Sequence, residues 1–150
     1  MNIENIKAIE SENPKTDNII EEFVSFDIAK LLKEKGFNER TEFLYEDGKT
    51  KLIESYITNS MLSTECYSAP TQQVALRWLR EIHKINVTVT PNLYETTFAF
   101  DVYKQGMDGW ERTGGDTDLV WTGEDPLWEN YQTYEEAVNN GIKYALKIIK

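Results

Sequence analysis

The stretch APTQQVALRWLREIHKINVTVTPN, residues 69–92, changes its apolar period half way along. In its first half, apolar residues recur three and four positions apart, which is the spacing of one helix face. Those residues are Ala75, Trp78, Leu79 and Ile82. In its second half, Val87 and Val89 alternate with polar residues, as in a half-buried strand. The stretch therefore predicts a helix over 72–83, capped by Thr71, that leads into a strand.

Two further helices are predicted from apolar stripes and end signals. One covers residues 26–35, and Ser25 is a suitable N-cap residue for it. The other covers residues 134–149, where Thr133 opens a capping box. Gly141 lies inside this last helix, where glycine is about 1 kcal/mol worse than alanine. Its presence there indicates a close packing approach by a neighbouring element.

Two hairpins are predicted between these helices. The first covers 42–57 and turns at Asp47-Gly48, a dipeptide that tolerates positive φ at both central positions. The second covers 86–103 and turns at Pro91-Asn92. In its second strand, aromatic residues alternate with small and polar ones, so one face is expected to be buried.

These elements predict an α+β fold with a single domain over residues 23–150. We expect a mostly antiparallel sheet of about four strands with the helices packed on one face, in the order α-ββ-α-ββ-loop-α. Residues 59–69 are expected to form a loop. Five glycines argue against long regular structure in residues 106–133, apart from a short strand around 118–122. Residues 1–22 are expected to be a flexible acidic arm.

Composition limits the classes of function. The chain has 150 residues, 40% of them hydrophobic, and a net charge of −10, with ten acids and two bases in residues 101–140 alone. This charge disfavours direct binding to DNA or RNA and favours a protein partner with a basic surface. With Cys66 as its one cysteine, the chain cannot form an intrachain disulfide. The sequence shows no signal peptide and no membrane-spanning run, so we expect a cytoplasmic protein with no membrane contact.

The segment GMDGWERTGGDTDLVWTGEDPLWENYQT, residues 106–133, is the candidate interaction surface because it combines acids with three tryptophans. Trp is enriched at binding hot spots, and acids around it would select a basic partner. The candidate residues are Asp108, Trp110, Glu111, Asp116, Asp118, Trp121, Glu124, Asp125 and Trp128. Whether the three tryptophans belong to the core or to an interface stays open. Asp116 and Asp118 either form a solvated turn or hold a divalent cation.

Catalytic signals are weak. The chain has a single histidine, His83, which lies near the apolar face of its helix and is expected to pack or cap there. No nucleotide-binding or zinc-protease motif is present. Arg77, Arg80 and Lys84 form a basic strip. It is either a solvated helix face, an anion contact, or a partner for the acidic segment of this chain or of a neighbour. The sequence thus predicts no catalytic residue, no cofactor-binding residue and no metal site.

Three segments resemble a group of small, uncharacterised phage and prophage proteins. They are FVSFDIAKLLKEKGFNE (23–39), APTQQVALRWLREIHKI (69–85) and TYEEAVNNGIKYALKII (133–149). They match an F-V-S helix, an A-P-T-x-Q-x-A-x-x-W-L-R-E helix and a T-Y-E-E-A helix that flank aromatic strands. The match covers 51 of 150 residues. The resemblance implies a phage or mobile-element origin and an α+β fold, and it brings no activity, cofactor or site residue.

Together these observations favour an acidic, phage-derived protein-interaction module that acts in the cytoplasm of a bacterial host cell. It would bind or inhibit a host factor with a basic surface. Two alternatives stay open. One is a small-ligand binder or enzyme with a pocket between the helices and the sheet. The other is a structural or self-associating phage protein.

Overall fold

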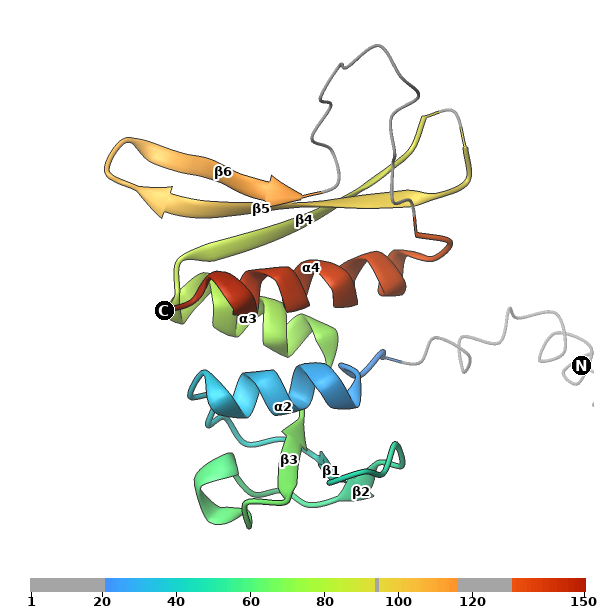
Figure 1. The fold of residues 1–150 in the computed structure, drawn as a ribbon, viewed down its shortest axis with the longest axis vertical. Helices are drawn as coiled ribbons and strands as arrows, with labels where there is room; N and C mark the ends of the chain where they lie inside the picture. The colour runs from blue at the N-terminus through green and yellow to red at the C-terminus, as the bar shows by residue number, and fades with distance from the viewer. Residues whose placement is uncertain (1–20, 94, 116–130) are drawn as a thin grey trace, which may run out of the picture.

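The computed structural model describes residues 21–93, 95–115 and 131–150. Within these residues, two three-stranded antiparallel sheets enclose a layer of helices (Figure 1). The elements in chain order are α2 (Phe26–Glu34), β1 (Phe43–Glu46), β2 (Ile53–Glu54), the 3-10 turn η2 (Asn59–Met61), β3 (Cys66–Ala69), α3 (Gln72–Ile82), β4 (Ile85–Pro91), β5 (Phe98–Gly106), β6 (Gly109–Gly115) and α4 (Tyr134–Ile148). The helices are too short or too polar to cross a bilayer.

All three predicted helices are confirmed within one residue at either end. The hydroxyl of Thr71 accepts from the N–H of Val74 at 3.4 Å, and that of Thr133 accepts from the N–H of Glu136 at 3.1 Å. These bonds satisfy N–H groups that the first turn of a helix leaves unpaired. Ser25 differs, because it has the extended backbone of an N-cap but makes no side-chain cap bond.

The predicted single sheet of about four strands is wrong. The structure has the order β2-β1-β3 in one sheet and β4-β5-β6 in the other. The residues expected as the loop 59–69 contain β3, which pairs with β1 from Phe43↔Ala69 to Glu46↔Cys66. Three of the four residues of β3 are buried, so the strand shows no polar alternation by which it could be found. The second missed strand, β6, is described below.

The two sheets share one set of helices. In Figure 1, α3 and α4 cover one face of the β4-β5-β6 sheet, and α2 lies between them and the β2-β1-β3 sheet. Helices therefore do cover one face of each sheet, as expected for the single sheet. The hairpins are confirmed as antiparallel pairs. The first turn lies at Asp47-Gly48 as predicted, because the N–H of Lys49 donates to the carbonyl of Glu46 at 3.0 Å, and Gly48 has a positive φ of 72°. The second turn differs, since it runs from Asn92, whose N–H donates to Thr97, rather than from Pro91.

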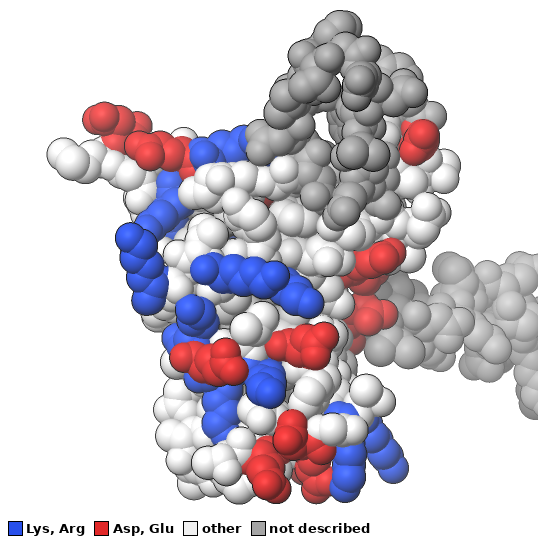
Figure 2. All heavy atoms as spheres, viewed as in Figure 1, with Lys and Arg blue, Asp and Glu red and all other residues white. Residues whose placement is uncertain are grey.

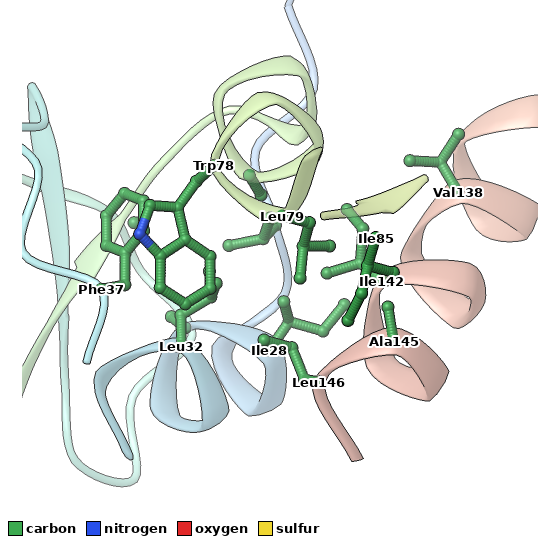
Figure 3. Packing of buried hydrophobic residues seen from close by; sticks show 14 of the residues in the cluster. Ile28, Leu32, Phe37, Trp78, Leu79, Ile85, Val138, Ile142, Ala145 and Leu146 are labelled. Carbon is green, nitrogen blue, oxygen red and sulfur yellow. The ribbon is translucent and has the colours of Figure 1, made fainter. Parts of the chain in front are cut away.

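The core lies where the helices meet (Figure 3). Trp78 of α3 is 6% exposed, and its ring centre lies 5.4 Å from that of Phe37 in an edge-on contact. Phe37 is fixed by the end of α2, because its N–H donates to Leu32 at 2.9 Å across Gly36 in the left-handed region. The apolar stripes seen in the sequence are thus the surfaces that face one another.

Gly141 is a point of close approach between α4 and the β4-β5 ladder. A Cβ atom at this position would lie 2.5 Å from Cγ1 of Val87 and 3.3 Å from Cβ of Phe100. Val87 is β-branched and stiff, so it cannot move aside cheaply. The close packing predicted from this glycine is confirmed.

We expect Trp78→Ala to lower the free energy of unfolding by roughly 3–5 kcal/mol, because it empties a buried aromatic site. Urea unfolding followed by circular dichroism measures the change. Val74→Ala on the exposed side of the same helix is the control and should change stability by less than about 1 kcal/mol. Equal effects of the two substitutions would mean that α3 does not pack through Trp78.

We expect Gly141→Ala to be destabilising by about 1–3 kcal/mol, although alanine is the better helix former. The added methyl would press on Val87. Val87→Ala should therefore remove part of the penalty, and a double-mutant cycle of the two substitutions measures this coupling. Additive effects would show that the helix does not touch the strand at this point.

Candidate functional site

Of the predicted interaction segment 106–133, the structure describes residues 106–115, which form the turn and the second strand of the β5-β6 hairpin, and residues 131–133. The strands of the hairpin pair from Gly106↔Gly109 at the tip to Asp101↔Gly115 at the base. In the view of Figure 1 it projects past the end of α4. Met107 and Asp108 form the tip, and Gly109 follows with a φ of 129°, which favours glycine. The hairpin therefore presents a short, defined end to solvent.

Two large apolar side chains are exposed at this end. Met107 is fully exposed, and Trp110 is 49% exposed on β6 opposite Gln105. Trp110 thus differs from the buried Trp78, and its side chain is available for contact. Exposed aromatic and thioether side chains are typical of binding surfaces, and these two lie three residues apart at the same end of the hairpin.

The charges of the hairpin are nearly balanced. Glu111 lies directly opposite Lys104 on β5, and Asp108 lies exposed at the turn. Figure 2 shows acidic side chains at the hairpin end and both signs of charge across the rest of the face in view. The described residues contain 17 acids and 14 bases, and residues 116–130 contain five acids and no base. Most of the acidity predicted for this surface is therefore contributed by the segment after β6.

The base of the hairpin is held by an ion pair. Oδ1 of Asp101 on β5 accepts from Nε of Arg112 at 2.8 Å and lies 2.7 Å from its Nη2. Asp101 is 6% exposed, whereas the Arg112 side chain is 30% exposed. A pair of this kind, with two nitrogens on one carboxylate oxygen, fixes the direction of the arginine more firmly than a single contact.

Helix α4 anchors the same strand. The hydroxyl of Tyr144 donates to the carbonyl of Thr113 at 3.1 Å, and the hydroxyl of Thr113 donates to the carbonyl of Val102 at 3.0 Å. Gly114 lies directly under the Tyr144 ring, where any Cβ would collide with the phenol. A bulge at Val102/Tyr103 accommodates the extra residue. The hairpin is therefore fastened to the core at its base and free at its tip.

The prediction that glycines prevent long regular structure here is wrong for residues 109–115, which form β6. Each glycine has a local role instead: Gly109 closes the turn, Gly114 makes room for Tyr144, and a Cβ at Gly115 would lie 2.7 Å from Cα of Asp101. One signal could have revealed the hairpin. Asp108-Gly109 is the same turn dipeptide that marks the first hairpin.

The other six candidate residues lie outside the described part of the chain. They are Asp116, Asp118, Trp121, Glu124, Asp125 and Trp128. The alternatives for the last two tryptophans and for a cation at the two aspartates therefore stay predictions, as does the strand around 118–122. Among the described residues, no group of His, Cys, Asp and Glu side chains could hold a metal ion.

A hollow on the outer side of α3 bears on the small-ligand alternative. It has a volume of about 300 Å³, and its lining includes Arg40, Arg77, Glu81, Trp78 and Ile82. Nε of Arg77 lies 2.9 Å from Oε1 of Glu81, so this member of the predicted basic strip is paired within the helix. The hollow is open to solvent and is lined by charged groups of both signs, whereas a typical ligand pocket is enclosed and mostly apolar.

His83 packs and caps as predicted. It ends α3, its ring centre lies 4.5 Å from that of Trp78, and its Nε2 is buried without a hydrogen-bond partner in the structure. Burial, and after it the positive charge of Lys35, lower the pKa of His83. Cys66 lies on β3 and shares no hydrogen bond with His83. The two residues therefore do not form a nucleophile–base pair within the described residues.

Neither a protein-family model, nor a curated protein sequence, nor a solved structure matches this chain.

The lowered pKa of His83 predicts a pH dependence of stability. The folded protein binds the proton less well than the unfolded chain, whose histidine titrates near 6.5. The preference of the folded state for neutral His83 therefore stabilises the protein fully above about pH 6.5. This stabilisation is lost as the pH falls through the pKa of His83 in the folded protein. Between about pH 7.5 and about pH 5.5, we expect the unfolding free energy to fall more for the wild type than for His83→Phe, which keeps a ring against Trp78. Urea unfolding at each pH measures this, and parallel pH profiles would contradict it.

Proposed function

We propose that this chain is an acidic protein-interaction module whose contact surface is the tip of the β5-β6 hairpin together with the acidic segment that follows it. The observation that carries the proposal is that the half-exposed Trp110 and the fully exposed Met107 lie at the same end of one hairpin. The exposed half of the indole adds little to the stability of the domain itself. An indole on a fixed support is, in contrast, the side chain most enriched at binding hot spots.

The support of the tip adds to this argument. Asp101, Arg112 and Tyr144 hold the base of the hairpin, so little conformational entropy is lost when the tip is engaged. Asp108 at the turn and the five acids of residues 116–130 would attract a basic surface and speed association. Glu111, which is opposite Lys104, is expected to contribute less.

In this proposal, the partner is a host protein with a basic surface, such as a nucleic-acid-binding factor, and the chain is phage-derived and acts in the host cytoplasm. The proposal rests on the resemblance of the three helices for its origin and on the charge for its partner class. Binding would divert or inhibit the partner by covering its basic surface.

The test is a pull-down from host lysate, with the wild type and its variants as baits, each at low and at high salt. We expect Trp110→Ala to lose a partner that the wild type retains, with a stability change of about 1 kcal/mol or less because the side chain is half-exposed. Tyr56→Ala is the matched control, since Tyr56 is a similarly exposed aromatic residue in the loop that follows β2, away from the hairpin. Loss of the partner with both variants, or with neither, would contradict the proposal.

A second variant tests the acidic part. It combines Asp116→Asn, Asp118→Asn, Glu124→Gln and Asp125→Asn. Surface charges contribute only about 0–1 kcal/mol each to stability, so the melting temperature should stay close to that of the wild type. Partner binding should weaken, chiefly through slower association, and added salt should weaken wild-type binding in the same way. Unchanged binding would mean that these acids serve only solubility.

A further inference from the structure

Within the described residues, strand β4 has a free edge. It pairs with β5 on one side and is the outermost strand of its sheet. At the two ends of this ladder, Lys84 accepts from the N–H of Gln105 at 2.9 Å and Asn92 donates to Thr97 at 2.8 Å. Bonded pairs alternate along an antiparallel ladder, so even-numbered residues direct their backbone groups toward β5. Ile85, Val87 and Val89 therefore direct theirs away from the sheet, and no described residue bonds them.

The other sheet edges in the described part of the chain are blocked. On β3, the outward N–H of Ser68 donates to Oδ1 of the buried Asn59 at 2.9 Å. Strand β2 is two residues long. On β6, charged side chains, a bulge and the Tyr144 hydroxyl on the Thr113 carbonyl interrupt the edge. These are the devices by which proteins prevent edge-to-edge pairing.

β4 has none of these devices over most of its length. Residues 85–91, INVTVTP, carry no charge in a chain of net charge −10, and the proline stands only at the last position. The register with β5 is regular, without a bulge. Such a regular, β-branched, uncharged edge is a template for another strand.

Two exposed apolar side chains flank the strand at opposite ends. Ile82, the last residue of α3, is 60% exposed, and Leu93, just after β4, is 89% exposed. Antiparallel pairing of two β4 strands brings Ile82 of one copy to the end where Leu93 of the other lies. The same pairing therefore joins the backbone edge and covers both side chains.

We infer that β4 is a dimer edge and that its occupant is β4 of a second copy of this chain. The strands pair antiparallel about a two-fold axis at Thr88, which makes one continuous sheet from the two β4-β5-β6 sheets. Val87 then lies opposite Val89 of the second copy, and their outward N–H and C=O groups exchange hydrogen bonds. The N–H of Ile85 donates to the carbonyl of Pro91 of the second copy, and this end pair makes only that one bond because proline has no N–H to donate in return.

A second copy fits this edge better than an unrelated extended peptide. Self-pairing keeps Val87 and Val89 of both copies on the helix-covered face, because a two-fold axis normal to the sheet does not exchange its faces. It also supplies the partner for each of the exposed apolar residues, Ile82 and Leu93. The paired strand segments carry no charges, so no like charges lie opposite one another.

The dimer leaves the β5-β6 hairpin free, because β6 is the opposite edge of the sheet. The inference is therefore independent of the proposed function. The dimer and the complex with a basic partner should also respond to salt in opposite directions. Salt screens the repulsion between two chains of net charge −10 and should strengthen the dimer, whereas it should weaken binding to a basic partner.

The first test measures mass and amide exchange on the full chain. Sedimentation velocity or light scattering should give twice the chain mass of 17.5 kDa at high protein concentration and the single mass on dilution. Amide hydrogen exchange by NMR should show Val87 and Val89 protected in concentrated samples and unprotected in dilute ones. A single mass at every concentration, or a dimer in which these two amides stay unprotected, would overturn the inference. Protection that appears only when an unrelated extended peptide is added would also overturn it.

The second test uses a charged pair of variants. Thr88→Lys places two lysines opposite each other at the two-fold axis, while within one chain residue 88 lies opposite Asp101, so the fold tolerates the new charge. Thr50→Lys, at an exposed site between β1 and β2, changes the net charge equally and is the control. We expect Thr88→Lys to raise the dimer dissociation constant about five- to tenfold relative to Thr50→Lys. Equal dissociation constants for the two variants would overturn the assignment of this edge.

Discussion

The close approach of α4 to the β4-β5 ladder at Gly141 is the constraint on which most of the structure depends. With no side chain at this position, the helix backbone lies against Val87 and Phe100. The opposite side of α4 then faces α2 and α3 with Ile142 and Leu146, which are fully buried. Helix α4 is thus packed on both sides, so it fixes the position of the β4-β5-β6 sheet relative to the rest of the core.

The same approach sets the geometry of the candidate surface. One turn after Gly141, Tyr144 reaches the carbonyl of Thr113 and passes over Gly114. The base of the hairpin is therefore tied to the core, while its tip carries Met107 and Trp110 in solvent. This division between a fixed base and an exposed apolar tip is what a preorganised contact element requires. The opposite edge of the sheet, at β4, is uncharged and regular, so the two edges suit different kinds of contact.

Only part of the candidate surface could be predicted from the sequence. Composition identified Trp110 and Asp108 because aromatic and acidic residues crowd one segment. Composition did not reveal β6, because glycine usually interrupts a strand. In this strand the glycines instead form a turn, make room for the Tyr144 ring and allow close contact with the backbone of Asp101. Nor did composition reveal the Asp101–Arg112 pair, because two residues eleven positions apart meet only once β5 and β6 are in register. Register depends on the turn, and the Asp108-Gly109 turn was the missed signal.

The sequence by itself determined the helices, their caps and the faces that they bury, because a period of 3.6 residues and a local hydrogen bond need no distant partner. It also determined the acidic charge and the close approach at Gly141. Only the tertiary structure decided that the strands divide into two sheets around one helix layer. The four residues of β3 show no alternation because both of their faces are covered, and which strand lies beside them is a non-local choice. The free edge of β4 is likewise a property of the assembled sheet, since a strand becomes an edge only through the absence of a neighbour.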